Sequence, residues 1–258
     1  MLRFKSLGSG SAGNATVVEA TSGQQVRRLL VDCGLGLKLL DARLAQAGLA
    51  ASQIDAIFIT HEHGDHIGCA RQFALRHRTP VWMSHGTWLG CAGPDFEGQL
   101  RQAQDAQPID LGELQITPFT VPHDAREPLQ LRCSDGARSL GILTDLGHAT
   151  PHVLAHLQGC DALLLECNHD PDLLAASSYP PFLKKRVGGM HGHLSNADAA
   201  QIALALNHAD LAHVVAAHLS RQNNHPDLAR AALGLAMGRK PGDIGVADQA
   251  QGCDWITL

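Results

Sequence analysis

The residues whose types are best suited to chemistry lie in one short segment, His61-Glu62-His63-Gly64-Asp65-His66. This segment directly follows residues 54–60, an apolar run typical of a fully buried strand. In an extended chain, side chains two residues apart point the same way, so His61 and His63 can share a face. Asp65 and His66 lie where the chain turns into a helix, and they face a second position. The segment therefore predicts two adjacent metal ions. A solvated His-rich loop, the alternative, needs no apolar strand as its anchor.

The elements that must position this segment alternate between strands and helices, which predicts a single α/β domain over residues 1–258. The expected strands cover residues 1–7, 16–20, 26–31, 54–60, 113–121, 129–134, 138–144, 161–165 and 212–217. The expected helices cover residues 37–47, 195–207 and 226–237. Asp135-Gly136 between two strands is a strong hairpin signal.

Composition excludes several classes of protein. With 45% hydrophobic and 17% charged residues, the chain of 258 residues has ample material for a core, so it is not disordered. No export segment and no run of about 18 apolar residues is present, which predicts a cytoplasmic protein that makes no membrane contact. The seven cysteines form no Cys-x-x-Cys pair and are expected to be buried free thiols. The net charge of −5 argues against broad capture of nucleic acid but allows a local basic footprint.

The pattern His-x-His-x-Asp-His at residues 61–66 resembles the signature of the metallo-β-lactamase superfamily. The resemblance implies a four-layer αβ/βα sandwich, two mixed β-sheets flanked by helices, with a dinuclear site at the sheet edge. It also implies three more ligands, His123, Asp145 and His218, each at the end of an expected strand. Taken singly, each could equally be a hydrogen-bonded polar residue at a strand end.

The superfamily pattern also implies how the ligands divide. His61, His63 and His123 hold the first ion, Asp65, His66 and His218 hold the second, and Asp145 bridges the two. Nitrogen and oxygen ligands without thiolate suit Zn or Mn, and Fe is compatible. The expected cofactor is therefore two divalent metal ions.

Further stretches narrow the resemblance to the YycJ/WalJ group, metal-dependent DNA exonucleases close to ribonuclease Z. They are residues 4–14, 30–34, 121–125, 144–147, 166–170, 192–196 and 218–224. This resemblance implies hydrolysis of phosphodiester bonds in DNA from a 5′ end, with nucleic acid as the substrate. The oligomeric state is left open.

The residues support phosphoester chemistry on their own terms. Two metals about 3.5–4 Å apart can hold a bridging hydroxide as nucleophile, and Asp65 can orient and deprotonate that water. His193, in a Gly-rich turn before a capped helix, is the candidate proton donor for the leaving group. Glu166 resembles the acidic residue of ribonuclease Z that pairs with such a histidine, and a carboxylate there would raise the histidine pKa. The alternative for His193 is an ordinary side chain near a helix cap.

Several residues are candidates for substrate contact. Lys184, Lys185 and Arg186, just after the aromatic residues Tyr179 and Phe182, form a candidate phosphate clamp with a base-stacking partner, or else a solvated helix face. Asn168 and His169 follow Glu166 and are candidate substrate contacts. Gly8 to Gly13 presents backbone amides to a phosphate or forms a tight turn. No role is assigned to His85, His148, His152, His156, His208 and His213.

Two other functions remain open from sequence. A small-molecule metallo-hydrolase acting on cyclic phosphodiesters, thioesters or lactones would use the same metals in a compact, closed pocket. A catalytically silent scaffold is disfavoured, because burying a full ligand set without metal is costly.

Overall fold

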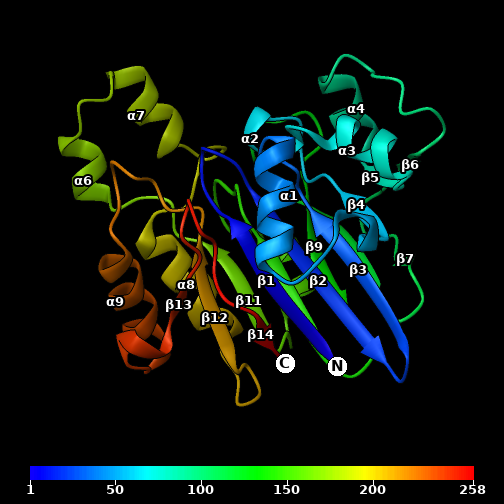
Figure 1. Cartoon of the computed structure of the whole chain (residues 1–258). Coiled ribbons are helices and arrows are strands. Elements are labelled where there is room, and N and C mark those ends of the chain that lie inside the picture. Colours follow the sequence, from blue (N-terminus) through cyan, green and yellow to red (C-terminus); the bar gives the residue numbers. More distant parts are fainter.

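Two seven-stranded β-sheets pack face to face in the computed structural model, which describes residues 1–258, and helices cover both outer faces (Figure 1). The first sheet has the order β14 (Ile256–Thr257), β1 (Leu2–Gly8), β2 (Ala15–Ser22), β3 (Gln25–Val31), β4 (Ala56–Phe58), β5 (Val81–Met83) and β6 (Leu100–Gln102). The second has the order β13 (Gly245–Val246), β12 (His213–Ala217), β11 (Ala162–Glu166), β10 (Ser139–Leu143), β9 (Leu129–Ser134), β8 (Gln115–Thr120) and β7 (Ile109–Asp110).

Both sheets are mixed in the same way. Strands β14, β1, β2 and β3 pair antiparallel, and β3 to β6 pair parallel. In the second sheet β7 to β10 pair antiparallel and β10 to β13 pair parallel. This layering agrees with the predicted four-layer sandwich of two mixed sheets.

The helices are α1 (Leu37–Gln46), α2 (Gly64–Ile67), α3 (Ala70–His77), α4 (His85–Gly90), α5 (Pro151–Leu157), α6 (Pro171–Ala176), α7 (Pro181–Val187), α8 (Asn196–Leu206) and α9 (Pro226–Met237). Two 3-10 turns, η1 (Ala51–Gln53) and η2 (Pro241–Asp243), complete the chain. None of the helices is both long and apolar enough to cross a membrane.

Three buried apolar clusters hold the four layers together. One lies between the sheets, one packs the first sheet under α1 and α3, and one packs the second sheet under α5, α8 and α9. Strand β2 shows the principle, because Val18 faces the opposite sheet and the adjacent Val17 packs under the helices. Since successive side chains alternate between faces, a strand buried on both sides is apolar throughout.

Local signals explain several element boundaries. The β9–β10 hairpin turns at Asp135-Gly136, where the Asp135 carboxylate accepts hydrogen bonds from the amides of Ala137 and Arg138 and Gly136 has a φ of +89°. Helix α8 begins after Ser195, whose side chain accepts a hydrogen bond from the amide of Asp198. These two features confirm the predicted hairpin and helix start.

The strand expected over residues 54–60 is shorter in the structure, spanning only Ala56–Phe58. The reason is that Thr60 bonds outside its sheet: its amide donates to the Asp32 carboxylate, and its carbonyl accepts from Leu129 of the other sheet. The chain therefore leaves the sheet edge just before His61. Most elements without a prediction, including α2, α3 and α4, are of eight residues or fewer, too short for hydrophobic periodicity to stand out.

Parallel strands bring their carboxyl ends to one edge of each sheet, and the following loops meet there. Three residues after such strands, Asp32, Asp145 and His218, have left-handed backbone with φ of 62°, 56° and 53°. This conformation is uncommon for residues other than glycine and costs free energy. The chain turns sharply at these points, which aims the side chains at the gap between the sheets.

Gly34 allows two loops to touch at this edge. The Gly34 amide donates to the Asn14 carbonyl, and the Asn14 amide donates to the Asp65 carbonyl at 2.8 Å. A Cβ atom on Gly34 would lie 1.7 Å from the Asp65 oxygen, far inside any possible contact distance. The position of the segment carrying residues 61–66 therefore depends on the absence of a side chain at Gly34, in the loop after β3.

We expect Gly34→Ala to lower the free energy of unfolding by about 1–3 kcal/mol, because the Asp65 loop must move to admit the methyl group. Urea denaturation measures this change. Gly242→Ala is the matched control, since nothing lies within 4 Å of its Cβ position, and its effect should stay within about 0.5 kcal/mol. Equal stability of the two variants would contradict the role given to Gly34.

Candidate metal centre

The seven expected ligands converge at the sheet edge in two groups of three. His61, His63 and His123 form one group, and Asp65, His66 and His218 form the other, with potential ligand atoms within 4.8 Å of one another in each. Asp145 forms further groups with members of both. The structure thus brings together all the residues expected as ligands.

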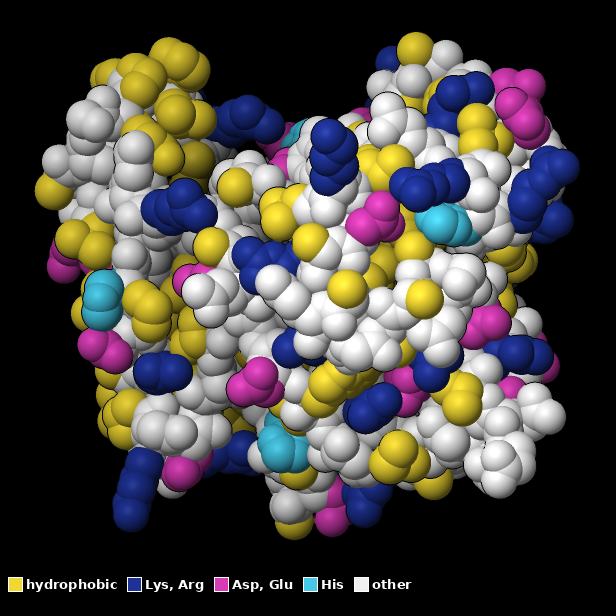
Figure 2. All heavy atoms as spheres, viewed as in Figure 1, with side chains coloured by type: hydrophobic (Ala, Val, Ile, Leu, Met, Phe, Trp, Pro, Cys, Tyr) yellow, Lys and Arg dark blue, Asp and Glu magenta, His cyan; other side chains and the backbone are white.

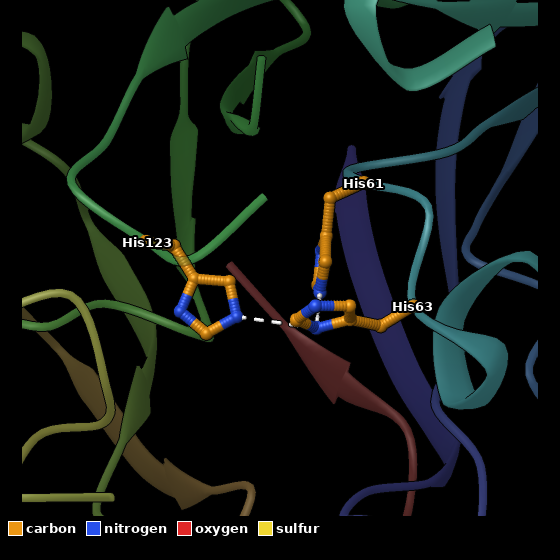
Figure 3. Close-up of side chains that lie close together, drawn as sticks. All are labelled: His61, His63 and His123. Carbon is orange, nitrogen blue, oxygen red and sulfur yellow. Dashed lines mark hydrogen bonds between the residues drawn. The ribbon is translucent and has the colours of Figure 1, made fainter. Parts of the chain in front are cut away.

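The first group joins the two sheets. His61 and His63 extend from the loop after β4, and His123 approaches from the loop after β8 on the opposite side (Figure 3). The His61 Nε2 atom lies 3.0 Å from His63 Nδ1, and His123 Nε2 lies 3.4 Å from the same atom (Figure 3). Three imidazole nitrogens therefore face one point.

In the second group, the buried rings of His66 and His218 face the half-buried carboxylate of Asp65. The Oδ2 atom of Asp65 lies 3.6 Å from Nε2 of His66 and 3.6 Å from Nε2 of His218. Asp145 lies between the groups, with Oδ2 3.0 Å from His66 Nε2 and Oδ1 3.9 Å from His123 Nε2. One carboxylate thus reaches both groups.

Each of three ligand histidines has its other ring nitrogen occupied. The His61 Nδ1 atom lies 3.0 Å from the Thr60 hydroxyl, and His123 Nδ1 lies 2.9 Å from the Gly192 carbonyl. The His66 Nδ1 atom lies 2.7 Å from the Asp32 carboxylate. Such partners set the tautomer and leave Nε2 free to bind a metal.

Two residues that contact His66, Asp32 and Asn14, had no predicted role. The side-chain amide of Asn14 lies 3.0 Å from His66 Nε2. The available signal was a buried apolar strand ending in an aspartate, Leu30-Val31-Asp32, the same arrangement that marked Asp145. Its partner His66 is 34 residues away in sequence, so the pairing was not visible.

The donor set fits divalent metal ions. Asp145 Oδ2 and His218 Nε2 are buried and have no hydrogen-bond partner, an arrangement that is costly for polar atoms unless a ligand satisfies them. Burial would raise the pKa of Asp145, but the neighbouring His218 and His66 rings hold it well below its usual value. An ionised carboxylate among imidazoles is suited to bind cations such as Zn²⁺ or Mn²⁺.

Glu166 connects a ligand to the expected proton donor. Its Oε1 atom lies 2.8 Å from His193 Nδ1 and 3.1 Å from His218 Nδ1, and its Oε2 accepts from the amides of Leu146 and Leu194. Burial would raise the pKa of Glu166, but His193 and the hydrogen bonds lower it to about 2. Burial would lower the pKa of His193, but the carboxylates of Glu166 and Asp145 together more than offset this, so the pKa is raised. The contact of Glu166 with His218 was not expected from sequence.

A cleft of 370 Å³ opens over the site and is lined by His63, Asp65, Asp145, His193 and His218. Figure 2 shows the surface hollowed between the arm of α6 and α7 at upper left and the side of α2 to α4 at upper right. Tyr179 and Arg186 of this arm also line the cleft. The Arg186 guanidinium pairs with Asp124 at 2.6 Å and keeps 59% of its side chain exposed.

The other candidate substrate contacts lie elsewhere. Lys184 and Lys185 do not line the cleft, and the Lys184 ammonium donates to the Ala175 carbonyl. Asn168 is buried and donates to the His218 carbonyl at 3.0 Å, which makes it a support for a ligand-bearing loop. His169 is buried as well and is absent from the cleft lining. In the Gly-rich loop, Ser11 reaches the cleft, and the Ser9 hydroxyl accepts from the His218 amide at 2.8 Å.

The chain is similar in sequence and in fold to proteins of one superfamily. A beta-lactamase superfamily domain model matches residues 27–219. Exodeoxyribonuclease WalJ of Streptococcus pneumoniae is 32% identical over 204 residues, covering 77% of this chain and 74% of WalJ. Exodeoxyribonuclease YycJ of Bacillus anthracis is 32% identical over 204 residues, covering 77% and 75%. The metallo-beta-lactamase fold protein YhfI from Bacillus subtilis superposes with a TM-score of 0.75 at 18% identity, covering 99% of this chain and 98% of YhfI.

We expect Asp32→Asn to weaken metal binding by about 10–100-fold, because His66 loses the charged partner that orients its ring. Asparagine tolerates the left-handed backbone at this position, so the fold should persist. Competition with a chelator measures the metal affinity. Asp254→Asn, at a fully exposed aspartate, should bind metal as the unaltered chain does. Unchanged affinity in Asp32→Asn would show that His66 needs no such partner.

Proposed function

Because the chain belongs to the metallo-β-lactamase superfamily, and within it to the family of WalJ and YycJ, we propose that it is a divalent-metal-dependent phosphodiesterase that degrades DNA as a 5′-to-3′ exonuclease. The observation that carries the proposal is the pair of three-ligand groups joined at Asp145 beneath a cleft that also holds His193. This arrangement has the parts that phosphoryl transfer by two metal ions requires.

The ligands divide between two positions in this proposal. His61, His63 and His123 would hold one ion, Asp65, His66 and His218 would hold the other, and Asp145, which forms groups with members of both sets, would contribute a ligand to each. Two divalent ions in these positions supply Lewis acidity, which activates water and offsets charge on the phosphoryl oxygens. The carboxylate of Asp65 lies at the cleft wall, where it can orient an attacking water and accept its proton.

His193 is the proposed proton donor to the leaving oxygen. Its Nδ1 is occupied by Glu166, so Nε2 is the nitrogen available to a substrate in the cleft. Its side chain is 22% exposed, enough to meet a ligand while its position stays defined. Glu166 acts through His193 by holding the ring orientation, and it does not touch the substrate.

Arg186 is the best-placed cation for a phosphate of the DNA backbone. Its guanidinium lies at the cleft wall with a planar set of donors that suits phosphate oxygens. The exposed Lys185 on the same helix extends the positive charge outside the cleft, and Tyr179 offers a ring for base stacking. Lys184 and Asn168 contribute indirectly, by supporting segments around the site, and no substrate contact is proposed for the buried His169.

The experiment that tests the function is digestion of end-labelled single-stranded and duplex DNA with Mn²⁺ or Zn²⁺. Bis-p-nitrophenyl phosphate and a thioester are compared in parallel. Progressive loss of nucleotides from the 5′ end supports the proposal. Hydrolysis of the thioester with intact DNA would establish a small-molecule hydrolase instead.

We expect His193→Gln to lower kcat by about 10²–10⁴-fold with metal content unchanged, because the proton donor is lost and no ligand is. Asp145→Ala should instead lose metal from both positions, since its carboxylate contacts both groups. Metal analysis and turnover of bis-p-nitrophenyl phosphate measure both effects. Metal loss in His193→Gln would make this residue a ligand and end its proposed role as proton donor.

We expect Arg186→Ala to raise KM for long DNA and to reduce the salt dependence of kcat/KM by about 0.7–0.9 in log–log slope, the effect of one lost phosphate contact. Turnover of bis-p-nitrophenyl phosphate should change far less, because that substrate lacks an extended backbone. Lys240→Ala is the control. Lys240 is exposed and lies just after α9, directly before η2, so this variant should behave as the unaltered protein on both substrates. Equal losses on both substrates would place Arg186 at the chemical step.

A further inference from the structure

A second group of metal-binding side chains lies outside the catalytic cleft. Asp105, His152 and His156 present possible ligand atoms within 4.8 Å of one another, and none of them lines the cleft. Asp105 comes from the loop after β6, and both histidines come from α5. Sequence reasoning assigned these histidines no role, since neither belongs to the ligand pattern at residues 61–66.

The two histidines are placed as a helical metal pair. His152 and His156 are four residues apart, so they lie on one face of α5, and their ring centroids are 4.5 Å apart. This spacing lets two imidazoles on one helix bind one ion. The ring of His156 stacks on Phe119 with an angle of 10° between the planes, which limits its rotation.

Asp105 completes the group from a fixed position. Its Oδ1 accepts hydrogen bonds from the amide of Thr120 at 2.7 Å and the hydroxyl of Thr120 at 3.1 Å. The same oxygen lies 2.9 Å from His152 Nε2, and the Oδ2 atom has no hydrogen bond. One carboxylate oxygen therefore anchors the loop, and the other is available to a cation.

His156, the third member of the group, has no hydrogen bond to its ring. Neither ring nitrogen of His156 has a hydrogen-bond partner within the protein, although the ring is only half exposed. The nearest cation, Arg132, donates to the carbonyls of His156 and Gln158 at the end of the helix.

Space for an ion and its water ligands is present. A shallow cavity of 340 Å³ borders two of the three residues, Asp105 and His152, and is also lined by Thr120 and Thr150. We propose that Asp105, His152 and His156 form a separate binding site for one borderline transition-metal ion such as Zn²⁺, completed by water. Two imidazoles and one carboxylate suit Zn²⁺ and disfavour Mg²⁺ or Ca²⁺, which prefer all-oxygen sites.

The ion would join three segments that the fold already brings together. Asp105 holds the end of β8 through Thr120, and β8 leads within three residues to His123. Helix α5 supplies the other two ligands. Binding of the ion would therefore stabilise the packing of α5 against the end of β8 in the second sheet. This role is independent of the proposed hydrolysis.

The test compares the zinc content of chains dialysed against a chelator-buffered, micromolar concentration of free Zn²⁺. His152→Gln and Asp105→Asn should each bind one ion fewer per chain than the unaltered protein. His85→Gln, at a histidine that belongs to no group of possible metal ligands and whose ring lies beside Gln102 and Trp88, should lose none. Asp105→Asn keeps an oxygen for the Thr120 amide, so it retains the loop anchor if His152→Gln disturbs the helix.

Circular dichroism of the metal-free chains checks that the variants are folded. Zinc contents of His152→Gln and Asp105→Asn equal to that of the unaltered protein would overturn the proposal. The measurement counts bound ions and does not depend on catalysis, so failure of the exonuclease assay leaves its result intact.

Discussion

The structure depends on one buried charge, the carboxylate of Asp145. This carboxylate is surrounded by imidazole rings, which can bind cations. Burial of an unpaired carboxylate is expensive, yet its neighbours are the imidazoles of His66, His123, His193 and His218 rather than apolar side chains. Its left-handed backbone adds to the cost. The surrounding sheets must therefore supply enough apolar packing to hold this polar centre, and a divalent metal ion bound there would balance the charge of the carboxylate.

The two mixed sheets meet that requirement because their apolar and polar residues lie in different places. Their inner faces and helix layers bury three apolar clusters, while the carboxyl ends of the parallel strands collect the polar residues at one edge. Asp32, Asp145 and His218, which have left-handed backbone, all lie at this edge. Rigid strands directly before the strained residues explain how the centre keeps its geometry without being part of the apolar core.

Glu166 links a proposed metal ligand to the proposed proton donor within this centre. A single oxygen of its carboxylate contacts both His218, a ligand, and His193, the proposed proton donor. Two backbone amides occupy the other oxygen, so the carboxylate has little freedom to rotate. The positions of the ligand and the donor are therefore set relative to each other by one rigid group, which is the kind of preorganisation that catalysis requires.

Features that depend on neighbours along the chain could be predicted from the amino-acid sequence. The spacing within residues 61–66, the polar residues ending apolar strands, the Asp135-Gly136 turn and the Ser195 cap are all local patterns, and the main strands followed from them. Which groups from distant parts of the chain meet became visible once the strands were placed in their sheets. The contact of Asp32 with His66, the choice of Arg186 over its neighbouring lysines at the cleft, and the approach of Asp105 to His152 over 47 residues are examples. Such contacts depend on strand order and register, because a shift of one residue turns every side chain to the other face of its sheet.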